Sequence, residues 1–264
     1  MSDHLRDKYV AVTGASGGIG REIALKAAER GAHLILLARS EERLKQLRQE
    51  IITRYRVEAY VYKLDVGDLP QVEKVFTRVL SEVGRIDILV NNAGFGVFKD
   101  AHETDLEEAR TMFDVNVLGL AACTKMVLPH MKVRKSGHII NIASQAGKIA
   151  SPKSSIYSAT KHAVLGYTNS LRLELADDRI FVTSVNPGPI ATNFFAIADE
   201  SGTYVKNVQR FMLKPDFVAE KVVNSMLTKK REINLPGWMN LGSIFFSLFP
   251  KTFERVGKKF IFKK

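Results

Sequence analysis

Short apolar runs alternate with longer stretches of mixed polarity along most of the chain. Runs of strand length stand at 9–13, 32–38, 58–64, 86–90, 138–143, 180–185 and 232–235. The stretches between them, such as 41–55 and 70–83, carry apolar residues at helical spacing. Strands that alternate with helices this regularly predict an α/β fold, with a parallel sheet covered by helices on both faces. Ligands of such a sheet gather at the carboxyl ends of the strands, where polar residues are candidates for function.

This alternation ends at about residue 236. No internal repeat, low-complexity tract or linker divides the part before it. A chain of 264 residues that is 45% hydrophobic can bury a sizeable core. We therefore expect a single domain over residues 1–236, large enough to be a catalytic domain, followed by an apolar and basic tail over 237–264.

The stretch from Ser144 to Lys161 carries the residues most suggestive of catalysis. Ser144 follows an apolar run, and Tyr157 and Lys161 stand four apart on an expected helix, so their side chains share one face. A positive charge beside a phenol stabilises the phenolate and lowers its pKa from about 10, which suits a general acid. Ser144 could hold a substrate oxygen by a hydrogen bond. Taken alone, a Tyr-x-x-x-Lys pair is also a common pattern on helix surfaces.

A glycine-rich turn joins the first strand to the helix that follows it. The run 9–13 ends in Gly14-Ala15-Ser16-Gly17-Gly18-Ile19-Gly20, and a helical pattern continues to Arg30. Glycines let the backbone approach a pyrophosphate, and a helix N-terminus offers free N–H groups to it. Strand, glycine-rich turn and helix in this order indicate a dinucleotide site. A tight turn without any ligand is the alternative.

The end of the second strand bears on the choice of dinucleotide. A carboxylate there would bind the ribose hydroxyls of NAD and repel a 2′-phosphate, but this chain has Arg39 and Ser40 instead. An arginine can hold that phosphate, although a solvated turn residue would look the same. We predict NADP(H) as the cofactor.

Composition and charge narrow the classes of function. The net charge of +11 and the pI near 9.7 would suit nucleic acid, but no binding motif accompanies them, so we expect no nucleic-acid partner. No His/Cys cluster has metal spacing, so no metal site is expected. The single cysteine, Cys123, fits a buried apolar position and a reducing compartment. The charged N-terminus shows no signal peptide, and we expect a cytoplasmic protein.

The tail combines an apolar, aromatic stretch over 238–249 with a basic segment. Within 251–264 a single acid, Glu254, stands against six basic residues, Lys251, Arg255, Lys258, Lys259, Lys263 and Lys264. About a dozen apolar residues cannot span a bilayer, which takes ~20. Such a stretch beside lysines suits a helix lying on an anionic membrane surface. Docking of the phenylalanines on the body or at a subunit interface is the alternative.

Taken together, these features resemble the short-chain dehydrogenase/reductase family, in its short single-domain branch of the NADP-preferring type. The resemblance covers residues from about 8 to 235. Its motifs occur in family order: Thr13-Gly14-x-x-x-Gly18-x-Gly20, Asp65, Asn91-Asn92-Ala93-Gly94, Asn116, Ser144, Tyr157-x-x-x-Lys161, and Pro187-Gly188 with Thr192. Each motif is modest alone, and their shared order makes the resemblance specific.

The resemblance implies a Rossmann-like, doubly wound fold with a seven-stranded parallel sheet. It implies that Tyr157 gives a proton to a carbonyl oxygen that Ser144 positions. Lys161 would hold the nicotinamide ribose, and Asn116 would anchor a water in a proton relay from Lys161. The cofactor contacts predicted from the turn and implied by the family motifs are Gly14, Ser16, Gly17, Gly18, Ile19, Gly20, Arg39, Ser40, Asp65, Val66, Asn91, Asn92, Ala93, Gly94, Tyr157, Lys161, Pro187, Gly188, Ile190 and Thr192. Family members usually form homodimers or homotetramers through two long helices, here about 106–131 and 154–176.

These features predict an NADPH-dependent oxidoreductase that reduces a ketone or aldehyde to an alcohol. The expected pocket residues are apolar and favour a hydrophobic or lipid-derived substrate: Phe95, Val97, Phe98, Ala146, Ile149 and the aromatic residues of a lid over 193–214. A redox-sensing module that binds the cofactor without turnover is the alternative, and the complete proton-transfer set argues against it. Epimerisation or dehydration on the same scaffold is a third hypothesis, but relatives with those activities tend to carry a separate C-terminal substrate domain. The substrate, the reaction direction, the choice between dimer and tetramer and the partner of the tail stay open at this level.

Overall fold

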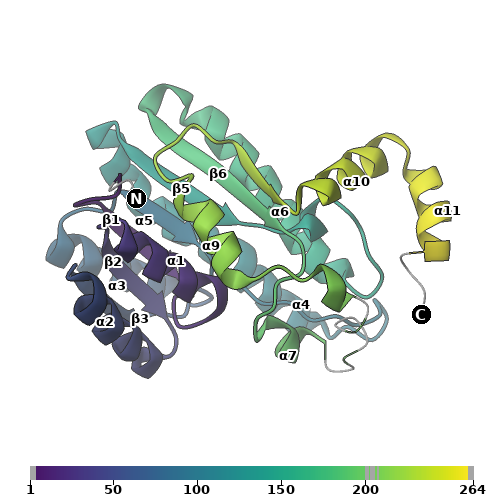
Figure 1. The fold of residues 1–264 in the computed structure, drawn as a ribbon, viewed down its shortest axis with the longest axis horizontal. Coiled ribbons are helices and arrows are strands. Elements are labelled where there is room, and N and C mark those ends of the chain that lie inside the picture. The colour runs from purple at the N-terminus through teal and green to yellow at the C-terminus, as the bar shows by residue number, and fades with distance from the viewer. Residues whose placement is uncertain (1–3, 200–201, 203–205, 207, 261–264) are drawn as a thin grey trace.

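Seven parallel strands form one sheet in the order β3-β2-β1-β4-β5-β6-β7 (Figure 1). The structure, a computed structural model, describes residues 4–199, 202, 206 and 208–260. The strands are β1 (Tyr9–Thr13), β2 (His33–Ala38), β3 (Ala59–Lys63), β4 (Ile88–Asn91), β5 (Gly137–Ile142), β6 (Ile180–Pro187) and β7 (Glu232–Leu235). The predicted fold class, a doubly wound sheet of seven parallel strands, is confirmed.

Helices cover both faces of the sheet. They are α1 (Gly18–Glu29), α2 (Glu41–Tyr55), α3 (Leu69–Val83), α4 (Leu106–Phe113), α5 (Leu120–Arg134), α6 (Ser155–Glu174), α7 (Phe194–Ala198), α9 (Pro215–Val223), α10 (Gly237–Leu248) and α11 (Pro250–Phe260). In the described part of the chain, shorter turns lie between these helices: the π-helical η1 (Asp114–Gly119) and the 3₁₀ turns η2 (Gln145–Gly147), η3 (Ala176–Asp178) and η4 (Gln209–Phe211). The last two helices project from one side of the body (Figure 1).

The core consists of two apolar layers, one on each face of the sheet. On one face α1, α2 and α9 pack against alternate strand residues such as Val12 and Leu36. On the other face α3, α5 and α6 pack against residues such as Ala11 and Leu37. Successive residues of a strand point to opposite faces, so a strand buried on both faces is apolar throughout. This is why the strands are visible in the sequence as continuous apolar runs.

The long helical stretch expected from about 106 to 131 is interrupted. It consists of α4, the π-helical turn η1 and α5, and it ends at Arg134. A stretch over Leu106–Arg134 is long and apolar enough to cross a membrane by length and composition. Its residues Cys123 and Val127 belong to the core layer that covers the sheet. Burial raises the pKa of the Cys123 thiol to about 12, as expected for a cysteine that serves as a small apolar side chain.

The parallel arrangement brings the carboxyl ends of the strands to a single edge. Adjacent strands pair Asn91 with Asn141 and Ile142 with Val185, so the chain leaves β4, β5 and β6 at neighbouring points. β1 lies beside β4 in the same way and delivers Thr13 to this edge. Segments that follow these four strands, far apart in the sequence, therefore come together in space.

Candidate active site

The glycine-rich turn after β1 is clamped to the end of β4. Asn92 Nδ2 donates to the carbonyl oxygens of Thr13 (2.9 Å) and Gly14 (3.3 Å). In return, Thr13 Oγ1 accepts from the backbone N–H groups of Asn92 and Ala93, both at 3.0 Å. Gly14 has φ +67° and Gly18 has φ +54°, values that favour glycine. The two predicted motifs thus form one structural unit.

The start of α1 fits an anionic group. Its N-cap is Gly17, which offers no side-chain cap, and the first turn holds no acidic residue. The first N–H groups of a helix lack partners within the helix, and the helix dipole favours negative charge there. Close approach is possible because the turn carries no side chains at Gly17 and Gly18. The pyrophosphate of a dinucleotide is the kind of group that such a cradle holds.

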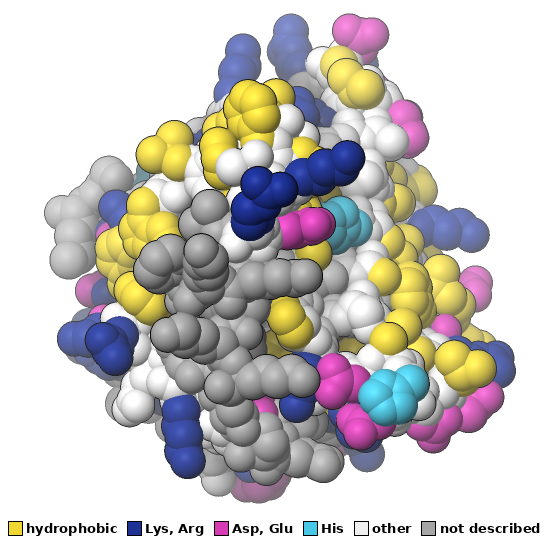
Figure 2. Space-filling view, turned by 90° about the vertical axis from the view of Figure 1, so that its right-hand side faces the viewer, with side chains coloured by type: hydrophobic (Ala, Val, Ile, Leu, Met, Phe, Trp, Pro, Cys, Tyr) yellow, Lys and Arg dark blue, Asp and Glu magenta, His cyan; other side chains and the backbone are white. Residues whose placement is uncertain are grey.

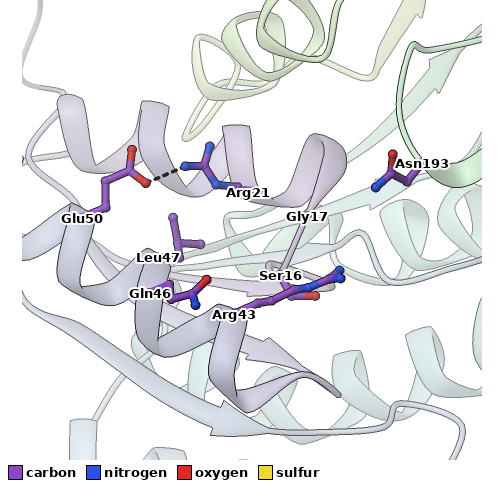
Figure 3. Close-up of a pocket in the computed structure, with 8 residues that line it drawn as sticks. All are labelled: Ser16, Gly17, Arg21, Arg43, Gln46, Leu47, Glu50 and Asn193. Atoms are coloured by element: carbon purple, nitrogen blue, oxygen red, sulfur yellow. Dashed lines mark hydrogen bonds and ion pairs between the residues drawn. The ribbon is translucent and has the colours of Figure 1, made fainter.

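A cavity of about 390 Å³ opens beside this turn (Figure 3). Eight residues line it: Ser16, Gly17, Arg21, Arg43, Gln46, Leu47, Glu50 and Asn193. Arg21 is neutralised by Glu50, at 2.5 Å between Nη2 and Oε2. Arg43, from the first turn of α2, reaches into the cavity beside Ser16 (Figure 3) and forms no ion pair within the described part of the chain. A cation without an acidic partner in an otherwise polar cavity suits a phosphate.

Arg43 is a residue that sequence reasoning missed. Arg39, the predicted phosphate ligand, is exposed at the end of β2, and Ser40 is the N-cap of α2. Arg43 follows Arg39 by four residues, and the available signal was this spacing across the start of a helix. The pattern was ambiguous because the segment is rich in charged residues of both signs.

Further predicted site residues lie where the strands β3 and β4 end: Asp65, Val66 and the segment 91–94. The Asp65 carboxylate accepts from the N–H of Gly67 at 3.0 Å, and Val66 is buried. The Asn91 side chain is only 2% exposed, and it donates to Thr124 and Asn141 beneath the strand end, each at 2.9 Å. Asn91 therefore holds β4, β5 and α5 together, while the following residues face the glycine-rich turn.

Tyr157 and Lys161 lie in the first turns of α6 and are both nearly buried. The Lys161 ammonium donates to the carbonyl oxygen of Ile142 at 3.0 Å and lies 5.7 Å from the centre of the Tyr157 ring. Burial lowers the pKa of Lys161 to about 8, because removal from water disfavours the charged form. A lysine with this pKa is mostly charged at pH 7 and loses its proton as the pH rises through about 8.

Ser144 stands at the end of β5, where it caps the short turn η2. Its Oγ accepts from the N–H of Ala146 at 3.1 Å and lies 3.5 Å from the carbonyl oxygen of Pro187. The next glycine, Gly147, approaches α6 so closely that a Cβ there would lie 2.7 Å from the Lys161 carbonyl oxygen. Residues 144–148, the candidate catalytic loop, are therefore seated directly on the helix that carries the Tyr-Lys pair.

Asn116 occupies the π-helical turn and connects it to two neighbours. Its Oδ1 accepts from the Phe95 N–H at 3.0 Å, and its Nδ2 donates to the Phe95 carbonyl (2.8 Å) and to Thr160 Oγ1 (3.1 Å). These bonds explain why an asparagine stands within an apolar helix, and π-turns are frequent at functional sites.

Aromatic side chains cover the Tyr157 ring. Phe98 and Phe194 each have ring centres 5.7 Å from it, and Phe195 packs on both, at 6.2 Å and 5.3 Å. Of the residues expected to line an apolar pocket, Phe98, Phe194 and Phe195 gather beside the Tyr157 ring, whereas Phe211 contacts Trp238. Gly96 was not singled out by the sequence, yet a Cβ there would lie 2.7 Å from the Tyr157 ring.

The segment that follows β6 forms a further side of the candidate site. Gly188 donates to the carbonyl of Leu235 at 2.6 Å, and Ile190 is buried and bridged to Leu213. Thr192 lies over the glycine-rich turn, since a Cβ on Gly18 would be 3.5 Å from its Cγ2. The structure thus brings the predicted groups from β1, β4, β5, β6 and α6 to one place. Within the described residues no group of His, Cys, Asp and Glu could hold a metal ion.

Comparison with known proteins decides the family. The family model described as short chain dehydrogenase matches residues 8–201. Dehydrogenase/reductase SDR family member 7B of Xenopus tropicalis is 34% identical over 258 residues, which make up 94% of this chain and 84% of that protein. This chain belongs to the short-chain dehydrogenase family.

Solved structures of short-chain dehydrogenases share the fold. An alcohol dehydrogenase from Thermococcus sibiricus, complexed with 5-hydroxy-NADP, is 31% identical, with a TM-score of 0.79 over 87% of this chain and 96% of that one. A serine dehydrogenase complexed with NADP+ is 34% identical, with a TM-score of 0.78 over 85% of this chain and 94% of that one. The family and the Rossmann-like fold expected from the motifs are both confirmed.

Proposed function

We propose that this short-chain dehydrogenase is an NADPH-dependent carbonyl reductase, which converts a ketone or aldehyde to an alcohol. The observation that carries the proposal is the buried pair of Tyr157 and Lys161, seated against the Ser144 loop. In the family the cofactor is a nicotinamide dinucleotide, and the solved relatives complexed with NADP(H) support NADP(H) here.

The cofactor-binding residues of the proposal form three groups. The glycine-rich turn and the start of α1 hold the pyrophosphate. Arg39, Ser40 and Arg43 hold the 2′-phosphate, while Asp65 and Val66 border the adenine. Asn92, Ala93 and Gly94, together with Pro187, Gly188, Ile190 and Thr192, border the nicotinamide half, and Asn91 supports them from below.

When bound, NADPH supplies the hydride, and the protein supplies the proton. The Tyr157 hydroxyl donates its proton to the carbonyl oxygen, which becomes the alcohol oxygen of the product. A cationic Lys161 stabilises the phenolate left on Tyr157, because the ammonium lies on the same helix face. Ser144 Oγ orients the substrate oxygen. Asn116 holds the 94–95 segment against α6, and a water beside its main chain would return the proton to Lys161.

The aromatic cover of Tyr157 favours a hydrophobic or lipid-derived substrate. Phe98 and Phe194 border the phenol with apolar surface that Phe195 extends, and these rings offer few hydrogen-bonding partners to a polar substrate. A panel of hydrophobic ketones and aldehydes, followed by loss of NADPH absorbance and repeated with NADH, tests the activity. Absence of turnover with every member, combined with tight NADPH binding, would favour a redox-sensing module that binds without chemistry.

Exposed apolar residues support assembly into a homodimer or homotetramer. Leu106 and Leu118 on the α4–η1–α5 stretch and Leu173 on α6 are 79%, 48% and 76% exposed. We infer that these helices meet a second copy, and light scattering on the purified protein tests this. A monomeric mass at micromolar concentration would contradict the assembly. We also place the protein in the cytoplasm, in peripheral contact with a membrane through residues 237–264, which cell fractionation tests.

If Arg39 and Arg43 bind the 2′-phosphate of NADPH, replacing either should reduce the preference of the enzyme for NADPH over NADH. Replacing Arg39 or Arg43 by Gln removes one charge-assisted hydrogen-bond donor, so each variant should raise the KM for NADPH by about tenfold or more. The KM for NADH should stay nearly unchanged, because NADH has no 2′-phosphate. Steady-state kinetics with both cofactors measure this ratio. Lys45→Gln serves as the matched control: Lys45 lies on the same helix as Arg43 but outside the cavity lining, its ammonium is paired with Glu41 in solvent, and its replacement should not alter the preference.

The pKa of Lys161 predicts the pH profile of reduction. Lysine is charged below its pKa, so the ammonium is largely present at pH 7 and is lost as pH rises through about 8. The value of kcat/KM should therefore fall by up to about tenfold per pH unit above this point. Initial rates across the range, with thermal melting at each pH as a check on folding, measure the profile. A flat profile between about pH 7 and 9 would contradict the assigned role.

A further inference from the structure

Helix α10 turns most of its large apolar side chains to solvent and keeps the polar side chains of Asn240 and Ser243 against the protein. Six large side chains in the helix and at its end are between 42% and 70% exposed: Trp238, Leu241, Ile244, Phe245, Leu248 and Phe249. The body-facing positions are Met239, Asn240 and Ser243, of which Ser243 is 4% exposed. A surface helix normally buries its apolar stripe. An apolar stripe directed outward, on a helix held by polar contacts, indicates a surface that another apolar phase covers.

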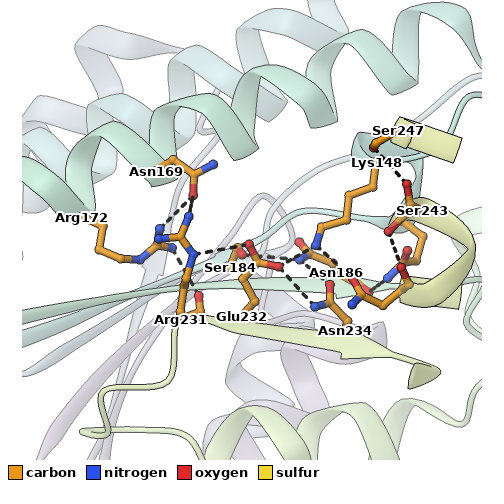
Figure 4. A network of polar contacts seen from close by, with 12 residues as sticks. Lys148, Asn169, Arg172, Ser184, Asn186, Arg231, Glu232, Asn234, Ser243 and Ser247 are labelled. Atoms are coloured by element: carbon orange, nitrogen blue, oxygen red, sulfur yellow. Dashed lines mark hydrogen bonds and ion pairs between the residues drawn. The ribbon is translucent and has the colours of Figure 1, made fainter. Parts of the chain in front are cut away.

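Polar contacts fix α10 to the catalytic loop (Figure 4). Lys148, one residue beyond η2, donates to Glu232 of β7 at 2.5 Å and to Asn240 Oδ1 at 3.3 Å. Burial would raise the pKa of Glu232, but the hydrogen bonds from Lys148 and Asn234 outweigh it and lower that pKa, so the carboxylate stays charged. Met239 packs on the Gly188 backbone, where a Cβ would lie 2.7 Å from its sulfur. The helix therefore borders the site on the side of Ser144.

The apolar stripe continues onto the substrate side of the molecule. Trp238 meets Phe211 of η4 edge-on, with ring centres 5.7 Å apart, and Phe211 is itself 51% exposed. Ile149, which follows the catalytic loop, lies 3.9 Å from the position of a Cβ on Gly242. The exposed aromatic surface thus extends from α10 to η4, which lies in the stretch expected from the sequence to form a lid.

Basic residues flank this surface. Helix α11 folds back on α10 through Phe253, whose ring centre is 5.2 Å from that of Phe246, and it exposes Lys251 and Arg255. In the sequence of 251–264, six basic residues stand against one acid. Figure 2 looks onto the side from which these helices project, and apolar side chains gather there beside Lys and Arg side chains. Apolar area bordered by positive charge is complementary to an anionic lipid surface.

We propose that the outward face of α10, together with Phe211, docks on an anionic lipid bilayer and holds the entrance to the active site against it. The inference rests on the proposed reductase function and adds the route of the substrate. A ketone dissolved in the bilayer would enter from the lipid phase beside Trp238. Because Lys148 joins α10 to the catalytic loop, docking of the helix would leave the position of the loop relative to α10 unchanged. A helix of this length lies on the bilayer and does not cross it.

The only tryptophan of the chain, Trp238, reports docking directly. Phosphatidylcholine vesicles that contain phosphatidylserine should shift its emission to shorter wavelength and carry the protein into the vesicle pellet. Phosphatidylcholine alone or high salt should weaken binding several-fold, since screening removes the charge attraction. Leu241→Asp should weaken vesicle binding by roughly a hundredfold. Val133→Asp, at a position 87% exposed on α5, is the matched control and should bind as the parent does.

Activity separates this inference from the proposed function. Leu241→Asp should keep the parent rate with a water-soluble ketone and lose about tenfold or more with a ketone dissolved in anionic vesicles. An unchanged Trp238 spectrum with anionic vesicles overturns the docking proposal, and turnover of the soluble ketone then leaves the reductase assignment intact. A shift of Trp238 emission that appears without lipid as the protein concentration is raised also overturns the docking proposal, because a second copy of the chain would then cover α10. No turnover of either ketone, with vesicle binding intact, overturns the reductase and the substrate route together.

Discussion

Replacing Tyr157 by Phe should abolish reduction while leaving NADPH binding nearly unchanged. A positioned general acid contributes typically ~10²–10⁴-fold to a rate, and phenylalanine has no proton to give, so kcat should fall by at least this range. The fold and the cofactor cradle should persist, because the aromatic ring still fills the space between Phe98 and Phe194. Single-turnover loss of NADPH absorbance measures the chemical step, and NADPH fluorescence measures binding.

A second tyrosine on α6, Tyr167, provides a matched control for Tyr157→Phe. Tyr167 lies ten residues further along α6, away from the candidate site, where its half-buried ring packs against the core. Tyr167→Phe should therefore reduce the substrate panel at close to the parent rate. If Tyr157→Phe also kept its turnover, another group would have to deliver the proton, and the proposed roles of Lys161 and Ser144 would lose their basis.

Most of the fold could be predicted from the sequence because its strands are buried on both faces. Such strands leave uninterrupted apolar runs, and the helices between them carry polar outer faces, so both are visible without any tertiary information. The ranges of β1, β7 and α2 agree with the expectation, and the other strands differ only at their ends. The site positions were accessible for a related reason: the parallel topology alone gathers the strand ends at one edge.

What the sequence did not reveal depends on contacts between distant segments. The π-helical turn at Asp114–Gly119 interrupts a helix whose apolar pattern is continuous, and its Asn116 bonds to Phe95 and Thr160 are long-range. The need for glycine at Gly96 appears only once the Tyr157 ring is placed beside it. Likewise, the sequence left open whether the apolar residues of 238–249 face a membrane surface or dock on the body. Their outward orientation follows from Lys148 and Glu232, which hold the polar side of the helix to the body.

Replacing Gly20 by Ala should disable the cofactor site from within the turn. A Cβ at this position would lie 2.4 Å from the Gly14 carbonyl oxygen and 2.4 Å from Asn92 Nδ2. The Gly14 oxygen is backbone, so no rotation of a flexible side chain can relieve the contact, and α1 must move away from β1. That displacement breaks the Asn92 clamp and misplaces the helix N-terminus. We expect NADPH binding to weaken by at least about a hundredfold and the protein to lose roughly 1–3 kcal/mol of stability.

A fluorescence titration with NADPH and a thermal melt measure the two effects separately. Gly166→Ala is the matched control, because a Cβ at this exposed position of α6 meets nothing within 4 Å. Alanine is the better helix former there, so the control should melt slightly higher and bind NADPH as before. Normal NADPH affinity in Gly20→Ala would mean that the dinucleotide does not depend on the start of α1, and the cradle would have to lie elsewhere along the strand ends. Weak binding with an unchanged melting temperature would instead place the whole cost of the methyl group on the ligand, because the turn would then adapt without disturbing the core behind it.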